Sequence, residues 1–299
     1  MNGQERQKQQ INRREFIGAA AALAATPFIT RMAQAEVMPK PNSKFNGVQI
    51  GAITYSYRSL PGSAEDILEH VTKCGISSIE LMGGPAEAFA KAKSGSSEKF
   101  PSMDGFKALR KMYNDAGVNI HIIKFGNIGD GRMSDEQIEY YFNAAKAVGA
   151  MGITRELSEE AAQRLGPIAD KHGVWIGFHN HTQLKPDTYD GKILTYGNYL
   201  GINLDIGHYV AGTNHSPLPL IEKFKNRIIS LHIKDRKVNN GPNMPLGQGD
   251  TPVALVLQYM KRNKLAFPAD IELEYRVPKD SDAIKEVTKC VEFCKKSLA

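Results

Sequence analysis

Polar residues follow four successive apolar runs in the second half of this 299-residue chain. The runs end, in order, at His179 and His181, at Asp205 and His208, at His232 with Lys234 and Asp235, and at Glu272 and Glu274. Imidazole nitrogens and carboxylate oxygens together are ligands that a borderline divalent metal ion accepts. Because the carboxyl ends of parallel strands meet on one face of a barrel, these residues predict a metal site on that face.

Spacing within the runs separates candidate ligands from their neighbours. Residues two apart on a strand share a face, so His179 and His181 are expected to point the same way, as are Glu272 and Glu274. We expect one residue of each pair to bind the metal and the other to lie behind it. The expected cofactor is one divalent ion, Mn, Co, Zn, Fe or Mg, and its expected ligands are His179, Asp205, His232 and Glu272.

Further polar residues near predicted strand ends are candidates for contacts with a substrate. Glu80 and His121 are expected to end the second and third strands, and Arg155 with Lys234 could bind a carboxylate or phosphate oxygen. Structural roles are an equal alternative for these residues. The expected substrate-binding set is His208, Lys234, Asp235, Glu274, Arg155, Glu80 and His121.

The elements that must position these residues alternate along the chain. Short β-rich runs are separated by longer amphipathic stretches, which predicts eight β/α units and therefore a single (β/α)8 TIM barrel of the α/β class. Strands are expected at residues 49–55, 78–82, 119–125, 152–157, 174–181, 201–205, 228–234 and 269–274.

Local signals mark where the intervening helices begin and end. Ser63 and Ser134 begin capping sequences, and glycines are expected to end helices at Gly75, Gly117, Gly149 and Gly173. A doubly wound open sheet would be expected to carry a glycine-rich turn after its first strand, and no GxGxxG or Walker sequence occurs. The late patch from Leu246 to Asp250 is interpreted as a loop that caps a helix starting near Thr251, with a phosphate cradle as the weaker alternative.

The first 35 residues predict an export signal. Asn12-Arg13-Arg14-Glu15-Phe16 resembles a twin-arginine motif, and an apolar stretch and the small residues Ala33-Gln34-Ala35 follow in the order of such a signal. The apolar stretch is shorter than the roughly 20 residues that span a bilayer. We expect a signal peptide at 1–35 and the barrel at 36–299, in a periplasmic or otherwise exported protein without a stable membrane anchor after cleavage.

Charge and cysteine content narrow the class of partner. The formal charge is +6, and removal of residues 1–35 takes away five basic and two acidic residues, which leaves +3. So small a charge, without a basic run, argues against nucleic-acid binding. Three cysteines are too few for a disulfide framework. The expected partner is a small molecule, and a homo-oligomer is left open.

Four sequence elements together resemble the xylose-isomerase-like barrel proteins, which include sugar phosphate isomerases and epimerases. The elements are Phe178-His179-Asn180-His181, Leu204-Asp205-Ile206-Gly207-His208, Leu231-His232-Ile233-Lys234-Asp235 (followed by Gly247-x-Gly249-Asp250) and Ile271-Glu272-Leu273-Glu274. For the ketose epimerases of this superfamily, the resemblance implies a metal shell of Glu, Asp, His and Glu from consecutive late strands. His179 stands at the first of these positions, so this chain departs from the pattern there.

The departure at His179 bears on the reaction, because the two glutamates of those epimerases also act as acid and base on opposite faces of an enediolate. Either His179 or His181 takes over proton transfer, or Glu156 on the preceding strand enters the metal shell. The metal would polarise a carbonyl and stabilise the developing oxyanion. The expected catalytic residues are therefore His179, His181, Glu272 and Glu156.

The resemblance and the signal together predict an exported, metal-dependent isomerase or epimerase of an unphosphorylated sugar or keto-sugar. A keto-glycoside lyase or hydratase that uses the same site is the first alternative, because proton loss next to a carbonyl begins both kinds of reaction. A non-catalytic sugar-binding barrel is the second. A metal-dependent apurinic endonuclease is the least expected, since the chain lacks a basic face for DNA.

Overall fold

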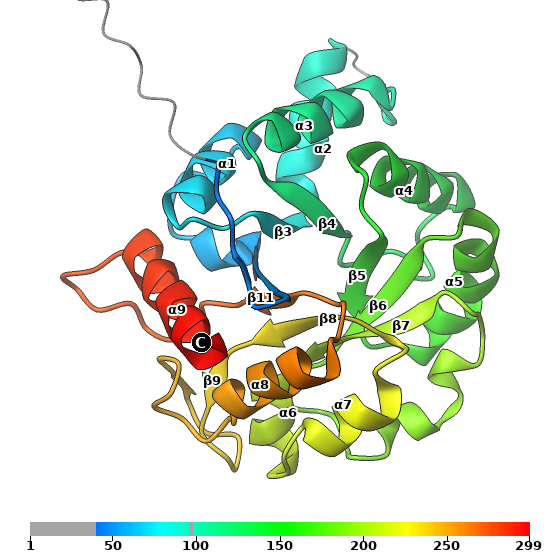
Figure 1. The fold of residues 1–299 in the computed structure, drawn as a ribbon. Coiled ribbons are helices and arrows are strands. Elements are labelled where there is room, and N and C mark those ends of the chain that lie inside the picture. Colours follow the sequence, from blue (N-terminus) through cyan, green and yellow to red (C-terminus); the bar gives the residue numbers. More distant parts are fainter. Residues whose placement is uncertain (1–39, 96–97) are drawn as a thin grey trace, which may run out of the picture. The chain divides into compact units, whose positions relative to one another are not determined.

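Eight parallel strands form a closed ring in the computed structural model of this chain, which describes residues 40–95 and 98–299 (Figure 1). The predicted signal peptide, residues 1–35, and the predicted boundary at residue 36 lie outside the described residues. The barrel strands are β2 (Val48–Ile53), β3 (Ser78–Met82), β4 (Asn119–Lys124), β5 (Gly152–Glu156), β6 (Trp175–His179), β7 (Leu200–Asp205), β8 (Ile228–Ile233) and β11 (Ala269–Ile271).

Strand pairing follows chain order all the way round the ring. Each strand pairs with the next, and β2 closes the barrel by pairing in parallel with both β3 and β11. A short strand, β1 (Lys44–Phe45), adds to β2 in the antiparallel direction. The barrel strands are buried along most of their length, as expected when helices cover the outside and side chains fill the interior. The predicted single TIM barrel is confirmed.

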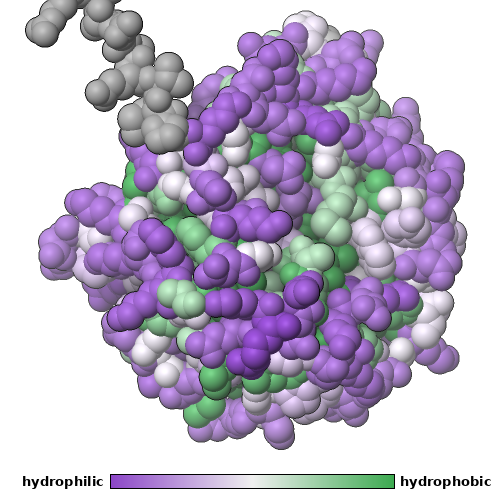
Figure 2. All heavy atoms as spheres, viewed as in Figure 1, coloured by the Kyte–Doolittle hydropathy of each residue, from purple (hydrophilic) through white to green (hydrophobic). Residues whose placement is uncertain are grey.

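Helices surround the ring on its outside (Figure 1). They are α1 (Ala64–Lys73), α2 (Gly83–Ser94), α3 (Asp104–Asp115), α4 (Asp135–Val148), α5 (Glu159–His172), α6 (Ile206–Thr213), α7 (Leu218–Phe224), α8 (Val253–Asn263) and α9 (Ala283–Leu298). Within the described residues, none of them is both long and apolar enough to cross a bilayer. The face shown in Figure 2 is largely hydrophilic, with hydrophobic residues scattered between polar ones.

The predicted helix boundaries are found where the local chemistry placed them. Ser63 forms a reciprocal capping box with Asp66 at the start of α1, and the Ser134 side chain accepts from the Gln137 amide at the start of α4. Gly149 and Gly173 end α4 and α5 with φ angles of 79° and 62°, a left-handed conformation that favours glycine.

The strands end earlier than predicted on the face that carries the polar residues. β6 stops at His179, β8 at Ile233 and β11 at Ile271, because ladder pairing with the neighbouring strands runs out at these points. The backbone of Glu272 still donates to the Ile233 carbonyl at 3.2 Å. Lys234 and the residues that follow His179 and Ile271 therefore lie in connecting segments rather than in regular strands.

Asp235 organises a loop and does not face the barrel opening, in contrast to its predicted role in substrate binding. It begins the short strand β9 (Asp235–Arg236), which pairs with β10 (Asn243–Met244). Asp235 is buried, and its carboxylate accepts from the amides of Gly247 and Gly249 at 2.8 Å each and of Thr251 at 3.0 Å. Three backbone donors thus hold this buried carboxylate within its own loop, and Asp235 does not line the cavity described below. The interpretation of the 246–250 patch as a loop before a helix is confirmed, since α8 begins at Val253.

Replacing Asp235 by Asn should destabilise the fold, because an amide group cannot accept hydrogen bonds on both of its ends and would face the backbone donors of the loop. The expected loss is about 2 kcal/mol of unfolding free energy, the range for bonds to a charged acceptor. Urea denaturation measures it. The control is Asp250→Asn, an exposed carboxylate in the same loop, for which a much smaller change is expected. Equal losses in the two variants would contradict the role assigned to Asp235.

Candidate metal centre

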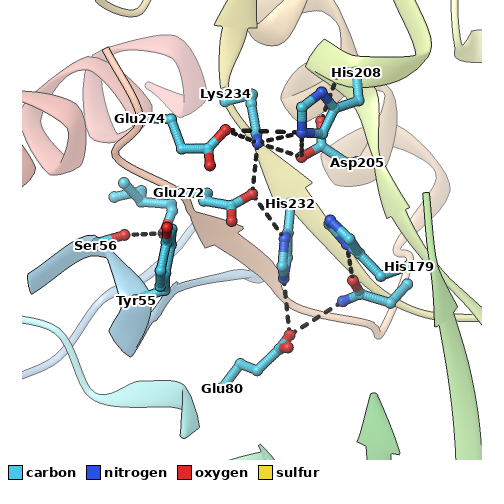
Figure 3. A network of polar contacts seen from close by, with 12 residues as sticks. Tyr55, Ser56, Glu80, His179, Asp205, His208, His232, Lys234, Glu272 and Glu274 are labelled. Carbon is cyan, nitrogen blue, oxygen red and sulfur yellow. Dashed lines mark hydrogen bonds and ion pairs between the residues drawn. The ribbon is translucent and has the colours of Figure 1, made fainter. Parts of the chain in front are cut away.

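Four side chains predicted as metal ligands converge at one end of the barrel (Figure 3). His179 and Asp205 are the last residues of β6 and β7, His232 is the fifth residue of β8, and Glu272 follows β11 directly. One ligand atom from each lies within 4.8 Å of the corresponding atoms of the other three, and all four residues are buried. Consecutive strand ends thus assemble a donor set of two imidazoles and two carboxylates.

Hydrogen bonds fix the available nitrogen of His179, whereas both ring nitrogens of His232 face carboxylates. His179 Nδ1 lies 2.7 Å from Oδ1 of Asn203, and the Asn203 amide is oriented because its Nδ2 donates to Glu80 at 3.1 Å. His179 Nδ1 must then carry the proton, which leaves Nε2 with a free lone pair. His232 Nε2 lies 2.9 Å from Glu80 Oε2, whereas Nδ1 faces Glu272 at 3.0 Å. Donation of the outer ring N–H to an acceptor is the usual arrangement for a metal-binding histidine.

Asp205 offers one oxygen to the protein and one to the centre. Oδ1 accepts from the amide of His208 at 2.7 Å and caps the start of α6. Oδ2 is buried and has no hydrogen-bond partner. The side chain of Asn180 holds the Asp205 backbone in place by bonding its amide and its carbonyl. An orphaned carboxylate oxygen beside two imidazoles is a donor set that fits a divalent ion, so the predicted ligands fit the predicted cofactor.

The burial of these groups shifts their pKa values in opposite directions. Burial, with the neighbouring His232 and Lys124, lowers the pKa of His179 to about 3, so this imidazole is neutral. Burial opposes the charge of His232 as well, but Glu80 and Glu272 outweigh it and raise the pKa of His232 well above its ordinary value, so a divalent ion would have to displace a proton from this ring. Burial also raises the pKa of Asp205 above its ordinary value. For Glu272 the effect of burial is outweighed by Lys234 and His232, which hold its pKa well below its ordinary value.

Lys234 supplies a positive charge among the carboxylates (Figure 3). Its Nζ lies 2.9 Å from Asp205, 2.8 Å from Glu272 and 2.6 Å from Glu274, and the residue is 3% exposed. Lys234 was predicted to bind an anionic group of the substrate. All three of these contacts are instead to protein carboxylates.

A cavity of about 230 Å³ opens beside two of the four candidate ligands, His179 and Glu272. Its lining residues are Ile53, Tyr55, Met82, Lys124, Glu156, His179, His181, His208, Glu272 and Glu274. His181 is 57% exposed at the side chain, and its Nε2 lies 2.9 Å from Glu156 Oε2. The other Glu156 oxygen accepts from Lys124 at 3.0 Å. The contact with Glu156 raises the pKa of His181, whereas His181 and Lys124 hold the pKa of Glu156 below its ordinary value despite its burial.

Five residues of the predicted substrate-binding set lie away from the cavity lining: Lys234 and Asp235, described above, and Glu80, His121 and Arg155. Glu80 and His121 do not end their strands: each is the third residue, of β3 and β4 respectively. His121 contacts Ser78 and Asp270 through its two ring nitrogens, and Glu80 contacts Thr154, Asn203 and His232. Arg155 donates to the carbonyls of Glu156 and Ile128, so it supports a loop. The predicted strands at 78–82 and 119–125 already ran past Glu80 and His121, so the assignment of these two residues to strand ends was wrong.

The prediction missed Lys124 and Asn203, which hold Glu156 and His179 in place. Both could have been found from the sequence. Lys124 is the last residue of β4, at the same level as the other polar strand ends. Asn203 lies two residues before Asp205 and therefore on the same face of β7. His208 and Glu274 were predicted for the site, and both line the cavity.

Comparison with known proteins assigns the chain to a family. The pattern of the xylose isomerase-like TIM barrel family matches residues 68–295. A curated relative, inosose dehydratase of Clostridium beijerinckii, is 24% identical over 196 residues, which span 63% of this chain and 55% of the relative. The match therefore covers little more than half the length of that enzyme.

Solved structures with low sequence identity share the fold. The probable 3-DHS dehydratase AsbF of Bacillus anthracis is 16% identical, with a TM-score of 0.64 over 82% of this chain and 98% of its own. An L-ribulose 3-epimerase is 14% identical, with a TM-score of 0.61 over 84% of this chain and 94% of its own. On its sequence pattern and its barrel, this chain belongs to the xylose isomerase-like TIM barrel family.

Proposed function

We propose that this chain is a divalent-metal-dependent enzyme that removes a proton next to a carbonyl of an unphosphorylated sugar or keto-sugar. The observation that carries the proposal is the set of His179, Asp205, His232 and Glu272, of which His179 and Glu272 line a cavity that the exposed His181 also lines. A relative named for dehydration of an inosose and similar structures named for a dehydratase and an epimerase agree with this class of chemistry. A divalent ion at the four ligands would polarise the substrate carbonyl and so acidify the adjacent C–H.

The cavity supports a small, uncharged substrate. Its volume of about 230 Å³ is below the roughly 300–1,000 Å³ of pockets for drug-sized ligands. Carboxylates of Glu156, Glu272 and Glu274 line it, and Lys124, the lysine among the lining residues, is already paired with Glu156. A phosphate would meet three carboxylates without an unpaired lysine, which favours a neutral sugar.

His181 is the base that the geometry favours. Its proximity to the Glu156 carboxylate favours a proton on Nε2 and leaves Nδ1 as the free acceptor. His179 is unsuited, because Asn203 holds its Nδ1 and Nε2 belongs to the candidate metal centre. Glu156, the third alternative, orients His181 and is itself held by Lys124.

Elimination suits this arrangement better than epimerisation. Epimerisation needs an acid and a base on opposite faces of the enediolate, and Glu272 and Glu274 are both paired with Lys234. Elimination needs one base. His181 takes the proton, and the electrons of the broken C–H bond form the enolate. When the carbonyl re-forms, these electrons make the carbon–carbon double bond, and a β-substituent leaves with its bonding pair. We therefore place a keto-sugar lyase or dehydratase first and an isomerase or epimerase second.

Deuterium exchange tests the proposed reaction. Incubation with a panel of keto-sugars and aldoses in D2O should give metal-dependent exchange at the carbon next to the carbonyl, and a chelator should abolish it. NMR measures the exchange and also shows an unsaturated product if elimination follows. His181→Asn should slow exchange by roughly 10²–10⁴-fold, the usual contribution of a general base, and should still bind metal. Absence of exchange with bound metal would instead favour a sugar-binding barrel.

Substitution of the candidate ligands tests the centre itself. Asp205→Ala and His232→Ala should each lose the bound ion, because each removes a donor from the buried set. Elemental analysis of the purified variants measures the metal content. Glu69→Ala is the control and should retain the ion, since the exposed Glu69 side chain pairs with Lys73 on α1 and lies outside the set of four. Full metal content in both Asp205→Ala and His232→Ala would contradict the assignment.

We also propose that the protein is exported through the twin-arginine route, on the basis of Arg13, Arg14 and the apolar stretch after them. Expression of the full chain should give a periplasmic protein whose first residue, determined by N-terminal sequencing, lies near Glu36. The double substitution R13K/R14K should retain the chain in the cytoplasm. Unchanged periplasmic yield in that variant would contradict this route.

A further inference from the structure

Lys234 occupies the space between two of the candidate metal ligands. Its Nζ lies 2.9 Å from Asp205 Oδ2 and 2.8 Å from Glu272 Oε2, and Figure 3 shows the ammonium group between the carboxylates. A divalent ion bound to both oxygens would lie within this same space. Two cations so close would repel each other strongly in a buried site.

The contacts of Lys234 with the carboxylates differ in hydrogen-bond geometry. This difference indicates the direction in which its ammonium group can move. Its ammonium group donates a hydrogen bond to Glu274 Oε2 at 2.6 Å. Its approach to Asp205 Oδ2 is close but lacks hydrogen-bond geometry, so that oxygen has no donor directed at it. Glu274 lines the cavity and is the most exposed of the three carboxylates, with 23% of its side chain accessible. If the ammonium group of Lys234 left Asp205 and Glu272, it would therefore keep its hydrogen bond to Glu274.

His208 also opposes Lys234 at its present position. Arg236 has no acceptor, so its donation to His208 Nδ1 at 2.7 Å leaves the proton of a neutral His208 on Nε2. That nitrogen lies 2.9 Å from Lys234 Nζ, so two donors face each other.

The backbone is shaped to admit the lysine. A Cβ atom at Gly207 would lie 2.4 Å from Lys234 Cγ and 2.8 Å from the Lys234 carbonyl oxygen. The absence of a side chain at position 207 thus lets the stem of Lys234 pass beside α6 to reach the carboxylates.

We propose that Lys234 is an internal counter-ion that fills the centre of the metal-free protein and gives way to the divalent ion by withdrawing to Glu274. The proposal rests on the proposed metal centre and adds a competition within it. Lys234 prevents repulsion between Asp205 and Glu272 in the absence of metal, and it lowers metal affinity as a consequence. The resulting centre exchanges its ion more readily than the same ligands would without the lysine.

Metal binding to Lys234→Met tests the competition. The full chain, freed of metal by a chelator, is titrated with Mn²⁺ by calorimetry. Lys234→Met should bind Mn²⁺ about tenfold or more tightly than the original chain, because the competing charge is gone. Lys289→Met is the control: it makes the same substitution at a lysine that pairs with Glu286 on α9, outside the four ligands and the cavity lining, and should change the Kd by less than about threefold. Lys234→Gln is the second variant if the methionine variant does not fold.

Glu274→Gln tests the withdrawal. In the original chain it should weaken Mn²⁺ binding, because Lys234 loses the partner that receives it. In the Lys234→Met background it should have little effect. Unchanged or weaker binding by the Lys234 variants would overturn the competition, and an equal effect of Glu274→Gln in both backgrounds would overturn the withdrawal. Failure of the original chain and of the Lys234 variants to bind Mn²⁺ would instead remove the metal centre of the proposed function.

Discussion

Carboxylates gathered at the buried end of a barrel require positive charge beside them, and this constraint organises the whole site. Asp205, Glu272 and Glu274 come from two strand ends, and removing such groups from water without compensation costs several kcal/mol each. The compensation comes from Lys234 and from His232, which lies between Glu80 and Glu272. The polar interior is thus stable only as a set, because each charged member is buried against an opposite partner.

The buried carboxylate of Glu80 also positions the imidazoles of His179 and His232. Glu80 lies below the centre and accepts from Thr154, Asn203 and His232, so one carboxylate connects four strands of the ring. Asn203 in turn orients His179. The rings at the opening are held by groups deeper in the barrel, which is why their free nitrogens are directed to the same place. His181 differs from these two rings, because its side chain is exposed and its partner, Glu156, also lines the cavity.

Much of the fold and the convergence of the site could be predicted from the sequence, because both depend on local patterns. Alternation of apolar runs gave all eight strands, and polar residues at the ends of late strands gave the four residues of the centre. The errors have a common physical origin. Strand ends are set by pairing with neighbours, which a single sequence does not contain, and the predicted strands at 174–181 and 269–274 therefore ran past His179 and Ile271, where β6 and β11 stop. The partners of Lys234 and Asp235 depend on loops and on charges from other strands, so their roles could not be read from neighbouring residues.

The double use of the Asp205 carboxylate constrains how this centre can change during evolution. One oxygen caps α6 by accepting from the amide of His208, and the other has no hydrogen-bond partner and faces the candidate centre. Glutamate reaches too far to cap the helix in the same way, and serine or asparagine can cap it without supplying a second anionic oxygen. A substitution at Asp205 would therefore disturb both the start of α6 and the candidate centre, whereas one at His179, which forms no helix cap, would disturb the centre and the contact with Asn203 alone.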